Sequence, residues 1–60
     1  MTVLPRIERF LNRSAMPPTV FGRQVANDPR LVLDMRRGRE PGDRMVERIE
    51  AFLYAQGEEG

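Results

Sequence analysis

The 60-residue sequence predicts an all-α fold, a compact domain of four short helices with a very tight turn between the middle two. Three observations lead to this prediction. Apolar residues recur at helical spacing in the first and last thirds of the chain, and prolines and glycines divide the chain into four segments of helix length. No segment alternates apolar and polar residues as a strand does. A chain of this length forms one domain at most, so residues 1–60 are expected to be a single domain.

The first helix is expected at residues 3–13. Thr2 can cap it, and Pro5 lies in the first turn, where the missing N–H of proline has little consequence. Prolines 17 and 18 disfavour helical geometry in the residues before them, so the helix should stop before a loop at 14–18. The apolar face follows the spacing i, i+1, i+4, i+7 and i+8: Val3, Leu4, Ile7, Phe10 and Leu11.

The second and third helices are expected at residues 18–26 and 29–37. Asn27 tolerates left-handed backbone geometry, Asp28 is a good N-cap, and Pro29 suits the first helical position, so this tripeptide stops one helix and starts the next. Gly22 is small enough for another helix to approach closely. Gly38 then supplies the terminating residue of the third helix.

The fourth helix is expected at residues 43–56, with Asp43 as its cap and Gly57 at its end. Residues 58–60 are expected to fray. Phe52 and Tyr54 can be core and rim respectively, or both can belong to a patch through which two copies associate. The apolar face repeats the spacing of the first helix: Met45, Val46, Ile49, Phe52 and Leu53.

Composition excludes several classes of function. The chain has no cysteine and no histidine, which removes disulfides and the usual ligand sets for zinc, haem and iron–sulfur clusters, so no cofactor is expected. Catalysis would fall on carboxylates, arginines, Ser14 or Tyr54 in a chain with little room for a pocket, so we do not expect an enzyme. The apolar residues are too scattered for a membrane span. No charged-then-apolar leader opens the chain, and a cytoplasmic, nucleoid-associated protein is expected.

Charge is distributed unevenly along the chain. Residues 1–39 hold eight arginines against three acidic residues, whereas residues 40–60 hold two arginines against six acidic residues. The net charge of +1 therefore understates the affinity of the basic part for a polyanion. All ten basic residues are arginines, whose forked donors suit phosphates and guanine edges.

Two short helices joined by a tight turn form a helix-turn-helix. Val32 and Met35 are spaced to point back at the second helix, and we expect Leu31 to be core as well. The opposite face of the third helix is left outward. It carries Arg30, Leu33, Asp34 and Arg37.

The run from Phe21 to Leu53, FGRQVANDPRLVLDMRRGREPGDRMVERIEAFL, resembles the phage repressor and Cro family (XRE-type) of helix-turn-helix DNA-binding domains. The resemblance lies in the helix pair, the glycine nine residues after Pro29, the basic and proline-containing turn, and the apolar-striped helix beyond it. It implies a lambda-repressor-like fold and operator binding as a homodimer. It also implies that the outward residues of 29–37 face the groove and that Thr19 lies near the phosphate-contacting start of the preceding helix.

The outward residues fit the chemistry of a DNA groove. Arg30 and Arg37 can donate to base edges or phosphates, and Leu33 suits a thymine methyl group. Asp34 can accept from a cytosine amino group, but we favour a role in which it orients Arg30 or Arg37 through an i, i+4 or i, i+3 pair. The remaining expected contacts are cationic: Arg36, Arg37 and Arg39 as phosphate clamps, with Arg23 on the helix before the turn.

The sequence therefore predicts a small transcriptional regulator that binds specific double-stranded DNA as a homodimer. Four neutralised phosphates per subunit would give a log–log salt slope of about −3 to −4. A helix-turn-helix-shaped module that binds a replication, polymerase or toxin protein is the first alternative, and a nonspecific architectural protein is the second. The arginines can also be an ordinary solvated surface.

Overall fold

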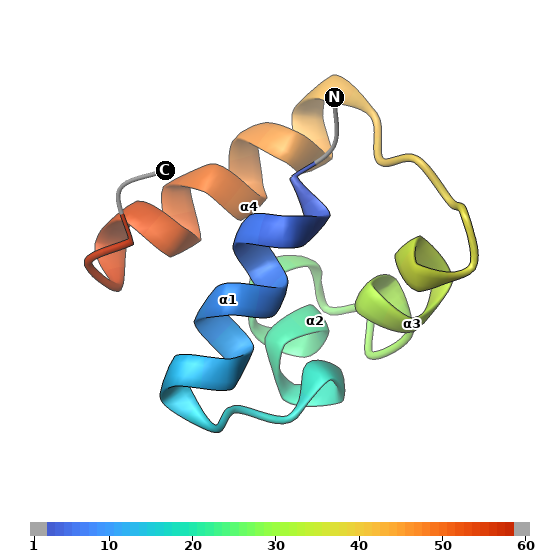
Figure 1. Cartoon of the computed structure of the whole chain (residues 1–60). Coiled ribbons are helices and arrows are strands. Elements are labelled where there is room, and N and C mark those ends of the chain that lie inside the picture. The colour runs from blue at the N-terminus through green and yellow to red at the C-terminus, as the bar shows by residue number, and fades with distance from the viewer. Residues whose placement is uncertain (1–2, 59–60) are drawn as a thin grey trace.

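The computed structural model describes residues 3–58, and these form four α-helices that pack into one unit of 24 × 21 × 19 Å. Within this part of the chain there is no strand, and the predicted compact all-α fold is confirmed. Figure 1 shows α1 crossing in front of α4, with α2 and α3 adjacent to each other on the far side from the chain ends. The helices are α1 (Leu4–Ser14), α2 (Pro18–Ala26), α3 (Leu31–Arg36) and α4 (Asp43–Ala55).

The core lies where the four helices meet. Phe10 of α1, Phe21 of α2 and Phe52 of α4 form a cluster of tilted and edge-to-face rings, with centroids 5.3–6.0 Å apart. These ring contacts join three helices directly. Burying a large apolar side chain completely stabilises the fold by about 1.5–3 kcal/mol relative to leaving it exposed. The buried apolar residues are Val3, Ile7, Phe10, Leu11, Phe21, Leu31, Val32, Met35, Ile49 and Leu53.

Both ends of α1 differ slightly from the prediction. Val3 holds the cap position without a side-chain hydrogen bond, and the predicted cap Thr2 lies outside the described residues. The helix continues through Ser14 because Ala15 takes the left-handed conformation, with φ 60°, and only then breaks the helix. Residues 15–17 connect to α2, which begins at Pro18 as predicted.

The turn after α2 follows the prediction at Asn27, which has φ 54°. The predicted start of the third helix at Pro29 is wrong, because the carbonyl of Asp28 accepts the N–H of Leu31, three residues on, at 3.1 Å. This bond makes Pro29 and Arg30 a tight turn, and α3 begins only at Leu31. The Asp28 carboxylate still caps the turn by accepting the N–H of Arg30 at 3.0 Å.

Gly22 allows the turn to fold back onto α2. The N–H of Asp28 donates to the Gly22 carbonyl at 3.0 Å, and a Cβ added at Gly22 would overlap the carbonyl oxygen of Asp28. The next atoms are the carbonyl carbon of Asp28, 3.2 Å from the added Cβ, and the Cβ of Leu31, 3.3 Å from it. The sequence predicted a close approach by another helix, whereas the closest atoms belong to the backbone of the turn.

Helices α3 and α4 end in the same way. In each, a glycine with positive φ follows the helix, at 109° for Gly38 and 89° for Gly57. The next residue then donates its N–H to a carbonyl five residues back, Arg39 to Asp34 at 3.0 Å and Glu58 to Leu53 at 2.9 Å. This is the Schellman motif, and it reverses the chain so that the side chain after the glycine returns along the helix. It ends α3 at Arg36 and α4 at Ala55, one residue before each predicted end. Of the helices in residues 3–58, none is long and apolar enough to cross a membrane.

Candidate nucleic-acid interface

The two sides of α3 differ as the sequence predicted. Leu31, Val32 and Met35 are buried against the rest of the domain, and Leu31 is core as expected. Leu33 is 39% exposed, which is unusual for a large apolar side chain in this domain. The outer side thus consists of Leu33 and Asp34, with the exposed Arg30 before the helix and Arg37 after it.

Three arginines of the helix-turn-helix have no carboxylate partner among residues 3–58. Arg23 lies on α2, Arg30 in the turn and Arg37 directly after α3, and all three are exposed. No ion pair joins any of them to an acidic residue in the described part of the chain. Thr19 is also exposed, at the second position of α2. These four residues, together with the exposed Leu33, are the part of the predicted site that can reach a partner without first breaking an ion pair within residues 3–58.

Arg36, one of the predicted phosphate clamps, is paired inside the protein. Its Nε and Nη2 donate to the two carboxylate oxygens of Glu8 at 2.7 and 2.8 Å, a bidentate pair that joins α3 to α1. This hydrogen bonding lowers the pKa of Glu8 from its usual value of 4.5. Arg36 therefore links α3 to α1 and is not a free phosphate clamp.

Arg39, another predicted clamp, is also paired. Its Nη1 lies 3.3 Å from a carboxylate oxygen of Asp28 and 3.3 Å from one of Asp34. The expectation that Asp34 orients Arg30 or Arg37 is wrong, because the carboxylate pairs with Arg39 instead. The sequence suggested the closer partners in the helix, but the Schellman turn at Gly38 brings Arg39 back to Asp34.

The arginines of α1 are tied to the C-terminal part of the domain. Arg6 pairs with Glu50 of α4 at 3.0 Å, and Glu58 lies between Arg9 at 3.5 Å and Arg13 at 2.8 Å. Glu58 is only 7% exposed, so the prediction that residues 58–60 fray is wrong for Glu58, while residues 59–60 lie outside the described part. The signal was present in the sequence, as an acidic residue directly after Gly57 and two arginines four apart on α1.

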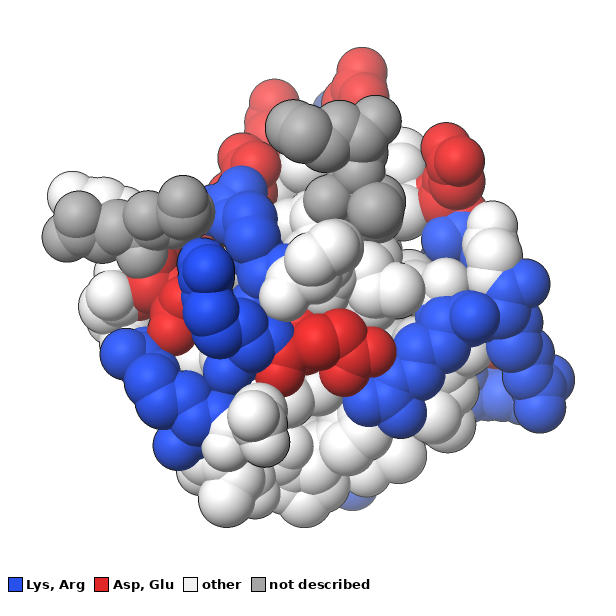
Figure 2. Space-filling model, viewed as in Figure 1, with Lys and Arg blue, Asp and Glu red and all other residues white. Residues whose placement is uncertain are grey.

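Positive and negative side chains both occur across the face shown in Figure 2. Blue side chains lie at the left and, over the region of α3, at the right, while red side chains lie between these two groups and along the upper edge, where α4 lies. Residues 40–58 bring acidic side chains to α4 and its flanks, although Arg44 and Arg48 are also exposed there. Within residues 3–58, the arginines without an ion pair are thus three on the helix-turn-helix and two on α4.

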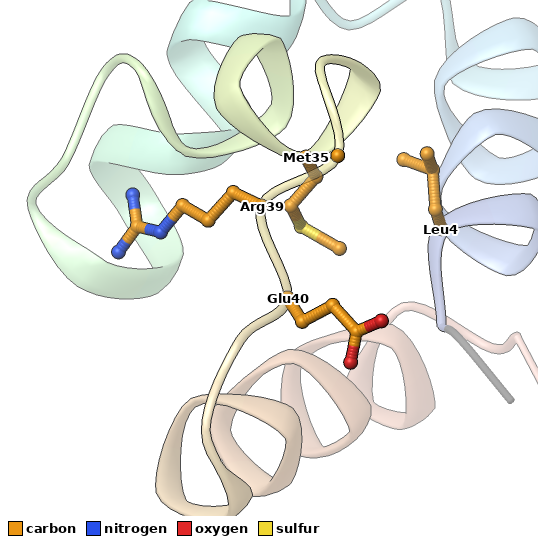
Figure 3. Close-up of a pocket in the computed structure, with 5 residues that line it drawn as sticks. Leu4, Met35, Arg39 and Glu40 are labelled. Carbon is orange, nitrogen blue, oxygen red and sulfur yellow. The ribbon is translucent and has the colours of Figure 1, made fainter.

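Two shallow hollows accompany these residues. One, of about 340 Å³, lies on the outer face of α2 and is lined by Val20, Arg23, Gln24 and Asn27. A smaller one, of about 170 Å³, lies between α1 and the end of α3, and Figure 3 shows Leu4 and Met35 facing it while the guanidinium of Arg39 points away. Neither is an enclosed pocket of the kind that binds small molecules. In the described residues no group of three carboxylates is placed to hold a metal ion.

Comparison with known proteins gives no match, since no protein-family model, no curated protein and no solved structure is significantly similar to the chain.

Proposed function

We propose that the protein is a sequence-specific double-stranded DNA-binding regulator that presents α3 and the turn before it to the major groove. The observation that carries the proposal is the separation of the arginines into two sets. Five are paired with carboxylates of the protein, whereas the other five are exposed and have no ion pair within residues 3–58. Three of these five, Arg23, Arg30 and Arg37, lie around the outer face of the helix-turn-helix. Guanidinium groups around the outer face of a helix suit both phosphates and base edges.

The proposed roles follow from position. Arg30, at the start of α3, is placed to read a base edge, and Leu33 on the same side suits a thymine methyl group. Arg23 and Arg37 flank this pair and are assigned to phosphates, with Thr19 as an additional hydroxyl donor at the start of α2. Two phosphate contacts per subunit give a log–log salt slope of about −2, shallower than the sequence alone suggested, because Arg36 and Arg39 are engaged within the protein.

We also propose that two copies bind together. A chain of this size gains little stability from its own core, and one short recognition helix offers few base contacts. Tyr54 on α4 is 74% exposed and is available for association between copies. A protein that dimerises only on DNA would show a monomer mass in solution and a two-subunit complex on a palindromic site.

The test begins with a duplex library containing a randomised segment, from which preferred sites are selected at about 0.15 M salt, where nonspecific binding is typically no tighter than micromolar. Arg30→Ala should relax preference at one base pair and weaken binding to the selected site by about 1–3 kcal/mol. Arg48→Ala removes another exposed arginine, on α4, that has no ion pair in the described residues 3–58, and it is the matched control.

Three results would distinguish the candidate functions. Selection of a defined site, with loss of preference in Arg30→Ala but not in Arg48→Ala, supports the regulator. Equal binding to all duplexes supports the architectural alternative. Absence of binding to any duplex overturns the proposal and leaves the protein-interaction module, for which the exposed Leu33 would be the natural anchor.

A further inference from the structure

We infer that Arg39 is a positioning residue of the proposed DNA-binding surface, which holds Asp28 and Asp34 in place and does not itself contact a phosphate. The inference rests on the proposed function and assigns a different role to a residue within it. A single nitrogen, Nη1, lies 3.3 Å from one oxygen of each carboxylate. The guanidinium thus bridges the turn before α3 and the middle of α3.

The backbone explains why Arg39 reaches both carboxylates. Gly38 adopts φ 109°, and the N–H groups of Gly38 and Arg39 donate back to Met35 and Asp34 at 3.1 and 3.0 Å. The chain therefore reverses at the end of α3, and the side chain of Arg39 runs back along the helix. Figure 3 shows it extending away from Leu4, on the side opposite the small hollow.

The two carboxylates lie among the unpaired arginines. Asp28 accepts the backbone N–H of Arg30, and Asp34 lies on α3, three residues before Arg37, which directly follows the helix. Each aspartate is therefore two or three residues from an arginine that the proposed function assigns to DNA. Exposed charges influence one another within about 10 Å at 0.1 M salt. Unpaired, the two aspartates would repel the approaching phosphates and offer Arg30 and Arg37 competing partners inside the protein.

Arg39 prevents both effects. It offsets part of the negative charge and holds the two carboxylates toward itself, which leaves Arg30 and Arg37 free to extend from the surface. A residue with this role matters only while Asp28 and Asp34 are charged. A phosphate-contacting arginine matters just as much when both are neutral.

A double-mutant cycle separates the two roles. The four proteins are the wild type, Arg39→Ala, the double variant D28N/D34N, and the triple variant D28N/D34N/R39A. Asparagine keeps an oxygen at position 28 that can accept the N–H of Arg30, so the turn is retained while the charge is removed. Affinity for the selected duplex and its salt slope are measured for all four by fluorescence anisotropy, after circular dichroism shows that each is folded.

The positioning role predicts that Arg39→Ala weakens binding about threefold to fivefold in the wild type and by less than about 1.5-fold in the D28N/D34N background. The salt slope should stay the same between the double and triple variants. The inference is overturned if Arg39→Ala weakens binding equally in both backgrounds and lowers the slope by about 0.9, because this is the signature of a lost phosphate contact.

Failure of the inference can be told apart from failure of the proposed function. If the wild type selects a site but the cycle shows no coupling, Arg39 contacts DNA and the proposed function stands. If the wild type binds no duplex, the proposed function fails and the DNA-binding role of Arg39 fails with it.

Discussion

Helices α3 and α4 both end in a Schellman motif, but the residue that follows the glycine differs between them. After Gly38 the Schellman turn returns an arginine, 43% exposed, to two carboxylates, whereas after Gly57 it returns a glutamate, 7% exposed, to two guanidinium groups. The same local signal thus gives a solvated cluster at one end and a buried anchor at the other. We therefore expect burial by the rest of the fold, and not the turn itself, to decide how much such a cluster stabilises the domain.

The largest expected effect comes from disturbing the turn before α3, which carries one of the two aspartates that pair with Arg39. Gly22→Ala places a Cβ against the carbonyl oxygen of Asp28, so the turn must move, and the free energy of unfolding should fall by about 2–3 kcal/mol. The shift would carry Asp28 away from Arg39 and leave Glu58 with both its partners. Denaturant unfolding measures the cost.

Gly42→Ala is the matched control for this substitution, because a Cβ there meets nothing and φ is −72°. Gly42 is the N-cap of α4, where alanine is less favourable than glycine, so the substitution should cost about 0.5–1 kcal/mol, less than Gly22→Ala. Equal losses in the two variants would contradict the assignment of Gly22 to close backbone packing.

The next effect concerns the buried anchor. Glu58→Gln leaves Arg9 and Arg13 without a shared counter-charge and should lower the free energy of unfolding by about 1–2 kcal/mol. Arg39→Gln, the mirror-image change in the solvated cluster, should cost less than about 1 kcal/mol. Glu47→Gln, at an exposed position of α4 without an ion pair in residues 3–58, serves as the control. A larger loss for Arg39→Gln than for Glu58→Gln would reverse the comparison.

A smaller effect tests whether the two turns are equivalent as backbone. Gly38→Ala and Gly57→Ala should each lower the free energy of unfolding by about 1 kcal/mol, because a Cβ at either position meets nothing and only the left-handed conformation is penalised. Urea titrations of both variants measure this. Of the two, only Gly38→Ala should also weaken DNA binding, and unequal effects on unfolding would show that the turns are not interchangeable.

The smallest effect is expected at the exposed pair between α1 and α3. Arg36 lowers the pKa of Glu8 from 4.5, so the pair stabilises the folded state above about pH 4.5, and this contribution is lost as the pH falls through the lowered value. Glu8→Gln should therefore reduce the difference in stability between neutral and acidic pH. The reduction should be small, because solvent reaches both side chains. An unchanged difference in the urea midpoints would mean that the pair does not form in solution.

Local patterns in the sequence were sufficient for most of the fold. The apolar stripes of the first and last helices and the left-handed residue at Asn27 each depend on neighbours a few residues away, and the structure has them as predicted. The start of α3 was misplaced because proline suits both the first position of a helix and a tight turn. The hydrogen bond from the N–H of Leu31 to the carbonyl of Asp28 decides for the turn, and the sequence alone does not predict this bond.

Local sequence patterns could not predict which carboxylates pair with the arginines. Arg36 meets Glu8 and Arg6 meets Glu50 across 28 and 44 residues, and these distances in sequence carry no periodic signal. Arg39 meets Asp34 across five residues, but only because the helix has ended between them. The sequence therefore predicted which residues are outward and charged, and the structure shows which of them form ion pairs within residues 3–58 and which do not.

The backbone contact between Gly22 and Asp28 has a consequence for how this domain can evolve. Because main-chain atoms fix the angle at which α3 leaves α2, no outward side chain of α3 is needed to hold it there. Positions 30, 33 and 37 can then mutate one at a time without reorienting the helix. Homologous proteins could therefore acquire a different binding preference through a few substitutions on the same backbone, while Gly22 could not be replaced.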